Sequence, residues 1–160
     1  MSGDFAQINH MFKTNAQVFE KATQGVPNDK WLIQPSEHSN HLTWIAGHAV
    51  VHRAKVSKML GSSWSAPWES LFARGAKLVP REQYPDPAEL QRAWQEVSEK
   101  LNSTLPKASA EVLAKPVPQG LPSLDGTVAG SIALFCFHET FHVGQMSYLR
   151  KLLGYGQAVG

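Results

Sequence analysis

The stretch TVAGSIALFCFHETFHVGQMSYLRKLLG, residues 127–154, is the part of the chain that decides the fold. It follows a loop rich in proline and glycine at residues 115–126, and Gly154 provides a helix stop. We therefore predict one long helix from about Thr127 to Leu153, capped by Gly154. Two histidines spaced four residues apart, His138 and His142, lie within it.

Three other stretches predict long helices. Residues 4–24 carry apolar side chains at three- and four-residue steps, and Gly25 follows as a C-cap. A second helix is predicted from about His41 to Leu60, with Ser39 or Asn40 as its N-cap. Its apolar positions form a wide surface rather than one stripe, which indicates a helix buried on two sides.

The third long helix has the clearest start. Asp86 is the predicted N-cap, Pro87 occupies the first helical position and Glu89 completes a capping-box pattern. Shorter helices are predicted around Trp68–Arg74 and Ser109–Ala114. Four long helices with loops of mixed length predict an all-α fold, an antiparallel four-helix bundle with short extra helices in its connections. The length of 160 residues fits one domain spanning residues 1–160.

The composition excludes several classes of protein. Hydrophobic residues make up 42% of the chain and charged residues 18%, so a disordered chain is excluded. The single Cys136 excludes an intramolecular disulfide and is typical of a reducing compartment. A net charge of +2 gives no reason to expect nucleic acid or an anionic membrane as a partner. Met1-Ser2-Gly3-Asp4 lacks the features of a signal peptide, so we expect a soluble cytoplasmic protein.

Histidines are the unusual residues of this chain. They form two groups, one in the first third and one near the end: His10, His38, His41, His48, His52, His138 and His142. Two pairs are spaced by four residues, 48/52 and 138/142, and this spacing places both rings of a pair on one helix face. Such a pair is well placed to chelate a divalent metal, although an open metal site usually has three protein ligands.

The segment His138-Glu139-Thr140-Phe141-His142 matches the H-E-x-x-H pattern of zinc proteases, in which the glutamate is the general base. Those enzymes take a third ligand downstream, but no His, Glu, Asp or Cys follows His142 here. A third ligand must therefore come from upstream. Glu139 points about 100° away from His138 on a helix, so it is either solvated or in contact with the next helix.

The predicted second helix is the upstream source. His41, Ile45, His48 and His52 lie on one stripe, and Gly47 would permit close approach of another helix. An inward-facing histidine from this helix would complete a three-histidine site with the 138/142 pair. The competing interpretation is a bundle whose histidines are hydrogen-bonded core residues.

Two other residues of the last helix bear on the site. Cys136 lies on a different face from His138, and we expect it to pack as a small apolar residue. Gln145 continues the stripe of His138 and His142 by one turn. An amide at this position predicts either a hydrogen bond to a ligand histidine or a polar cavity.

Two motifs carry a resemblance to a known family. The last helix, with Thr127-Val-Ala-Gly and HETFHVGQ at 138–145, resembles the C-terminal motif of the DinB-like superfamily, and Leu124-Asp-Gly-Thr127 before it also fits. The segment Asn40-His-Leu-Thr-Trp-Ile-Ala-Gly-His48 resembles the second-helix motif of that superfamily. Together the motifs cover about fifty residues.

The resemblance implies a four-helix bundle, often dimeric, that holds a divalent metal through three histidines. By motif these are His48, His138 and His142. The sequence leaves one ambiguity, because His52 lies one turn from His48 and could be a competing or fourth ligand. The metal of the family is zinc, nickel or iron, and we expect zinc or nickel before iron. Some members are thiol S-transferases that use low-molecular-weight thiols, and one is a mycothiol-dependent isomerase.

Three functions follow as expectations. The first is a metal-dependent enzyme of hydrolase or thiol S-transferase type, acting on a small-molecule substrate, with a low-molecular-weight thiol as candidate, and forming a homodimer. The second is a non-catalytic metal-binding or stress-associated bundle, and the third is a bundle with structural histidines. No catalytic residue is assigned, although His52, His41 and Glu139 are candidate proton carriers.

Overall fold

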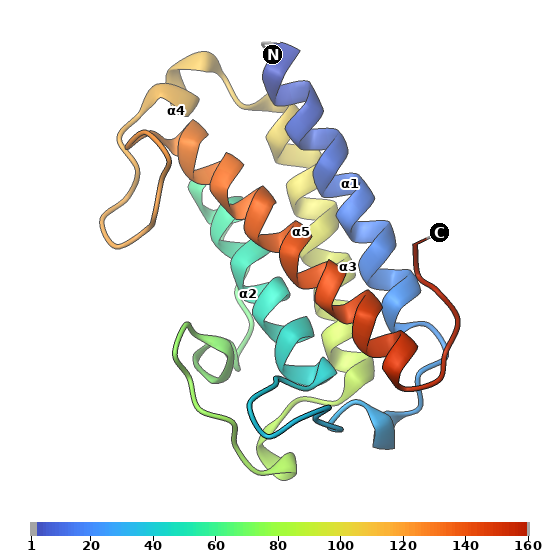
Figure 1. Cartoon of the computed structure of the whole chain (residues 1–160). Helices are drawn as coiled ribbons and strands as arrows, with labels where there is room; N and C mark the ends of the chain where they lie inside the picture. Colours follow the sequence, from blue (N-terminus) through green and yellow to red (C-terminus); the bar gives the residue numbers. More distant parts are fainter. Residues whose placement is uncertain (1–2, 160) are drawn as a thin grey trace.

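Four long α-helices lie side by side in the computed structural model, which describes residues 3–159 (Figure 1). They are α1 (Gly3–Thr23), α2 (Leu42–Met59), α3 (Pro87–Thr104) and α5 (Val128–Leu152). Within residues 3–159 there is no β-strand, only an isolated bridge between Pro116 and Thr127. The predicted all-α four-helix bundle is confirmed, α1, α2 and α5 lie within two residues of their predicted bounds, and α3 starts where it was predicted.

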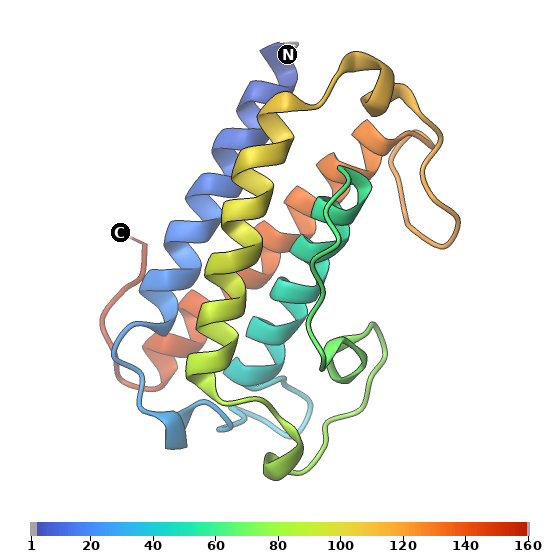
Figure 2. The same cartoon turned by 180° about the vertical axis from the view of Figure 1, so that it is seen from behind.

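Two helices of the bundle run in each direction. α1 and α5 run downward in the view of Figure 1, whereas α2 and α3 run upward. In the view turned by 180°, α3 is the long helix nearest the viewer and lies between α1 and α2 (Figure 2). The closest pairs are α1 with α5, α5 with α2 and α2 with α3. The antiparallel α2/α5 pair is the one that carries the histidines.

Short helical segments occupy the connections. α4 covers Ala110–Ala114, with the Ser109 hydroxyl accepting a hydrogen bond from the amide of Val112. The helix predicted around Trp68–Arg74 is a 3₁₀ segment, η2, over Glu69–Phe72. Three further 3₁₀ turns are η1 (Asn28–Lys30), η3 (Arg81–Gln83) and η4 (Leu105–Lys107).

Two helix starts differ from the prediction. His41, rather than Ser39 or Asn40, caps α2, because its Nδ1 accepts a hydrogen bond of 3.1 Å from the Trp44 amide. Asp86 is the N-cap of α3 as predicted, yet no capping hydrogen bond from its side chain occurs in the described chain. Glu89 does not complete a capping box, because its carboxylate accepts from Trp68 Nε1 at 2.7 Å.

The core fills the space between the four long helices. At one end of the bundle the Phe19 and Trp94 rings stack with centroids 4.0 Å apart. At the other end Phe12, Val56 and Ile132 form a second buried cluster. α2 is buried along most of its length, as its wide apolar surface predicts. None of the helices within residues 3–159 combines the length and apolar character needed to cross a bilayer.

Candidate metal centre

The histidines of α2 and α5 converge on one point between the two helices. His48, His138 and His142 each offer a ring nitrogen, and the three nitrogens lie within 4.8 Å of one another. His48 and His142 are buried, with 3% and 8% of their surfaces exposed, and His138 is half-buried. The expectation that an inward-facing histidine of the second helix meets the 138/142 pair is confirmed for His48.

In His48 and His142 a hydrogen bond at Nδ1 determines which ring nitrogen is available to bind a metal. His48 Nδ1 lies 2.7 Å from the carbonyl oxygen of Phe72, which can only accept, so Nδ1 carries the proton. His142 Nδ1 donates in the same way to Gln145 Oε1 at 2.8 Å. Both rings therefore present an unprotonated Nε2, held in orientation as metal-bound histidines usually are. Of the two alternatives predicted for Gln145, the hydrogen bond with a candidate ligand is observed, with Gln145 as the acceptor.

The spacing of the two α5 histidines fits a shared metal ion. His138 Nε2 and His142 Nε2 lie 3.1 Å apart, which is hydrogen-bond distance for the two neutral rings when no metal is bound. Two nitrogens bound to one zinc ion at about 2.0–2.1 Å in tetrahedral geometry are separated by about 3.3 Å. His138 Nδ1 is buried and has no hydrogen-bond partner within residues 3–159. The donor set of three neutral imidazoles suits zinc, nickel or iron.

Burial keeps these imidazoles neutral. Removal from water, opposed by the hydrogen bond to Phe72 and aided by the neighbouring His142, His138 and Lys55, lowers the pKa of His48 to about 4. Burial also lowers the pKa of His138 to about 4, with His142 and Lys55 contributing. The pKa of His142 is lowered by the same cause. At neutral pH the three rings are therefore neutral, with one protonated and one unprotonated nitrogen each, which is the form that binds a metal.

Gly47 has a different role from the predicted one. A Cβ at this position would lie 2.4 Å from the ring of Phe72, so the close neighbour is a side chain of η2, not another helix. The absence of a side chain lets the Phe72 ring pack against α2. That packing places the Phe72 carbonyl within reach of His48 Nδ1.

The His52 ring packs against the histidine cluster but is not part of it. Its ring stacks on His138 with centroids 4.5 Å apart and an interplanar angle of 18°, and lies 4.0 Å from the ring of His48. It is buried, and neither of its ring nitrogens has a hydrogen-bond partner among the described residues. Burial lowers its pKa to about 2. His52 is not one of the three histidines with converging nitrogens.

Glu139 contacts the next helix and is not solvated. Its two oxygens accept hydrogen bonds from Arg53 Nε at 2.8 Å and Arg53 Nη2 at 2.6 Å, and Asn15 Nδ2 donates to Oε1 at 3.0 Å. Arg53 also donates to Ser98 Oγ and to the carbonyl oxygen of Phe12. This network joins all four long helices. A carboxylate bound in this way does not serve as the general base of an H-E-x-x-H protease.

Two other residues singled out in the sequence, His41 and Cys136, lie outside the histidine cluster. His41 caps α2 and meets the edge of Tyr84. Cys136 is buried, and burial raises the pKa of its thiol to about 12, so it packs as an apolar residue as predicted.

The sequence interpretation missed Arg53 and Phe72. A signal for the first was present, because Arg53 is the only charged residue within 42–54 and Glu139 the only one within 127–149. Two isolated opposite charges in apolar helices indicate a buried pair. No comparable signal marks Phe72, since its contribution is a backbone carbonyl in a connecting segment.

One of two comparisons with known proteins gives a match. Residues 11–146 match the family model described as the DinB superfamily. The matched region includes all three converging histidines and the Arg53–Glu139 pair. A search of the curated proteins returns no match.

Proposed function

Because the chain belongs to the DinB superfamily, we propose that it binds one divalent metal ion through His48, His138 and His142 and is a metal-dependent enzyme. The observation that carries this proposal is the convergence of three buried imidazoles from two helices, with their nitrogens within 4.8 Å of one another. Zinc and nickel are the metals we favour, and iron also suits this donor set.

The chain's own residues prepare the site in two ways. Phe72 and Gln145 hold the rings of His48 and His142 with Nε2 free. Burial keeps these rings uncharged, so no proton has to leave when the metal binds at neutral pH. A bound divalent ion supplies Lewis acidity, which lowers the pKa of a water or thiol in its open positions. This chemistry suits a hydrolase or a thiol S-transferase.

The substrate is proposed to be a small molecule, with a low-molecular-weight thiol as co-substrate. The family resemblance supports the thiol and also supports a homodimer. The single, buried Cys136 supports a reducing compartment such as the cytoplasm. A non-catalytic metal-binding bundle is the alternative, and the buried polar network around Glu139 is compatible with either.

Metal analysis of protein purified without an affinity tag tests the site. After treatment with chelator and dialysis, we expect the chain to take up about one equivalent of zinc or nickel, and His48→Ala to abolish this uptake. His10→Ala, an exposed change on α1, should have no effect. Absence of uptake by the wild-type chain would leave only structural histidines.

A second experiment separates enzyme from binding protein. The metal-loaded chain is incubated with a panel of low-molecular-weight thiols and electrophiles, and with ester and amide substrates. Turnover that disappears in His48→Ala would support the enzyme. Full metal uptake without turnover across the panel would favour the binding protein.

A further inference from the structure

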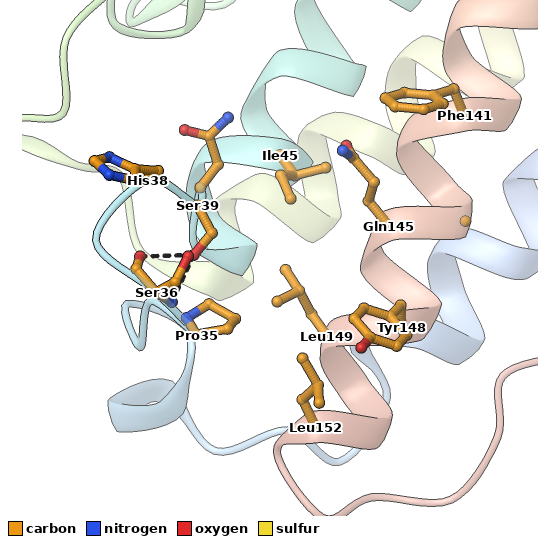
Figure 3. Close-up of a pocket in the computed structure, with 12 residues that line it drawn as sticks. Pro35, Ser36, His38, Ser39, Ile45, Phe141, Gln145, Tyr148, Leu149 and Leu152 are labelled. Carbon is orange, nitrogen blue, oxygen red and sulfur yellow. Dashed lines mark hydrogen bonds between the residues drawn. The ribbon is translucent and has the colours of Figure 1, made fainter.

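A groove of about 890 Å³ lies between the loop at residues 35–40 and the second half of α5. Figure 3 shows Pro35 and Ser36 on the loop side and Leu149, Leu152 and Tyr148 on the helix side. Ile45 at the start of α2 forms part of its wall. A volume of this size is typical of sites for small organic molecules, about 300–1,000 Å³.

The groove adjoins the histidine cluster through two residues of α5. Gln145 lines the groove, and its Oε1 accepts the hydrogen bond from His142 Nδ1. Phe141 also lines it, and its ring centroid lies 5.5 Å from that of His142. None of the three clustered histidines lines the groove itself; Gln145 and Phe141 separate it from the Nδ1 side of the His142 ring.

The lining has little charge. The residues of the described chain that form the walls include no Asp, Glu, Lys or Arg, and His38 is the titratable side chain among them. Three of them are large apolar or aromatic side chains that are more than half exposed: Phe141 at 58%, Tyr148 at 63% and Leu152 at 52%. Exposed apolar side chains gathered along a groove mark a binding surface. A charged molecular body would lose hydration here without gaining an ionic partner.

We propose that this groove binds the uncharged, apolar body of the substrate, an aromatic or branched aliphatic group, and directs its reactive end past Gln145 and Phe141 towards the histidine cluster. This inference rests on the proposed metal centre for the reactive end, while binding of the apolar body depends on the groove alone. Asn40 on the loop wall can hydrogen-bond to neutral polar groups of the same molecule, whereas the Ser39 hydroxyl is already bonded to Ser36.

Gly144 allows the groove to be blocked without damage to the fold. It lies on α5 in the wall of the groove, and a Cβ built on it meets no atom of residues 3–159 within 4 Å. Gly144→Leu should obstruct the groove, and it should also favour the helix because leucine is a better helix former than glycine. Gly144→Ala is the matched control, since it gives the same helix benefit with only one methyl group.

The first measurement is a fluorescence titration with N-phenyl-1-naphthylamine, a neutral aromatic probe, using metal-free protein. We expect saturable binding to the wild-type chain, a dissociation constant raised at least about tenfold in Gly144→Leu, and a change below about threefold in Gly144→Ala. Equal binding to all three proteins, or no binding to the wild-type chain, would overturn the proposal.

The second measurement tests proximity to the histidines. Loading with Co²⁺ should quench the bound probe, whereas Zn²⁺ should not, and His48→Ala should lose the quenching but keep the probe affinity. Metal uptake without quenching would refute the adjacency. If the protein takes up no metal but binds the probe normally, the proposed metal centre is wrong and the groove remains supported as a binding site.

The third measurement tests the competing occupant, a second copy of this chain. Sedimentation velocity of the wild-type chain and Gly144→Leu should give the same oligomeric state. If Gly144→Leu disrupts a dimer and the probe competes with dimer formation, the groove is a subunit interface and the proposal is wrong.

Discussion

Arg53 on α2 and Glu139 on α5 form a bidentate ion pair that is removed from solvent, with side-chain exposures of 0% and 1%. Each charge directly follows a histidine in the sequence, Arg53 after His52 and Glu139 after His138. The pair therefore fixes how α2 and α5 meet beside the histidine cluster. Asn15 and Ser98 extend the same contacts to α1 and α3.

Glu139→Gln should lower the free energy of unfolding by about 3–5 kcal/mol, because it leaves the Arg53 charge buried without its counter-ion. Urea denaturation of the metal-free protein measures the change. Glu99→Gln on α3 is the control, since Glu99 is exposed and should change stability by less than about 0.5 kcal/mol. A loss below about 1 kcal/mol in Glu139→Gln would argue against a stabilising role for the carboxylate charge.

His52→Ala should leave metal stoichiometry at about one equivalent. The reason is that the ring of His52 stacks on His138, outside the three converging nitrogens. Metal analysis of His52→Ala beside His48→Ala makes the comparison. Loss of metal equal to that of His48→Ala would show that the ligand set includes His52.

Gln145→Ala should weaken metal binding by about 10–100-fold, because the Nδ1 proton of His142 loses its acceptor and the ring loses its fixed orientation. Competition with a chromophoric chelator gives the affinity. Gln95→Ala, an exposed change on α3, should leave it unaltered. Unchanged affinity in Gln145→Ala would mean that the hydrogen bond does not tune the site.

His41 makes stability depend on pH. Burial lowers its pKa from 6.5 to about 4, so between these values the unfolded chain binds a proton that the folded chain does not. The contribution of His41 to the free energy of unfolding is therefore fully present above about pH 6.5. It is lost as the pH falls towards 4, by up to about 1.4 kcal/mol for each pH unit.

His41→Asn keeps a capping side chain but removes this titration. The fall in Tm of the metal-free protein between pH 7 and pH 5 should be smaller in His41→Asn than in the wild-type chain. His10→Asn, which alters an exposed histidine, should retain the full fall. An identical fall in His41→Asn and the wild-type chain would contradict a buried, neutral His41.

The helices and the histidine cluster were predictable because each has a local signal in the sequence. Apolar spacing and stop residues such as Gly25 and Gly154 gave the long helices, and both glycines adopt positive φ angles, 70° and 87°. The i,i+4 spacing placed His138 and His142 on one face. The choice of His48 over His52 came from the family motif, since spacing alone left both open.

Other features depend on which faces meet in space, and the local pattern does not contain this information. The pairing of Arg53 with Glu139 requires the register between α2 and α5. The contact between Gly47 and Phe72 requires the path of the long connection between α2 and α3. His41 replaces the better capping residues Ser39 and Asn40 because a buried imidazole happens to reach the Trp44 amide.

Anomalous diffraction at the zinc or nickel absorption edge, from crystals of the metal-loaded protein, tests the central claim most directly. The account predicts one strong peak between the Nε2 atoms of His48, His138 and His142. A peak at another position, or no peak from protein that retains its metal in solution, would contradict a three-histidine centre shared by α2 and α5.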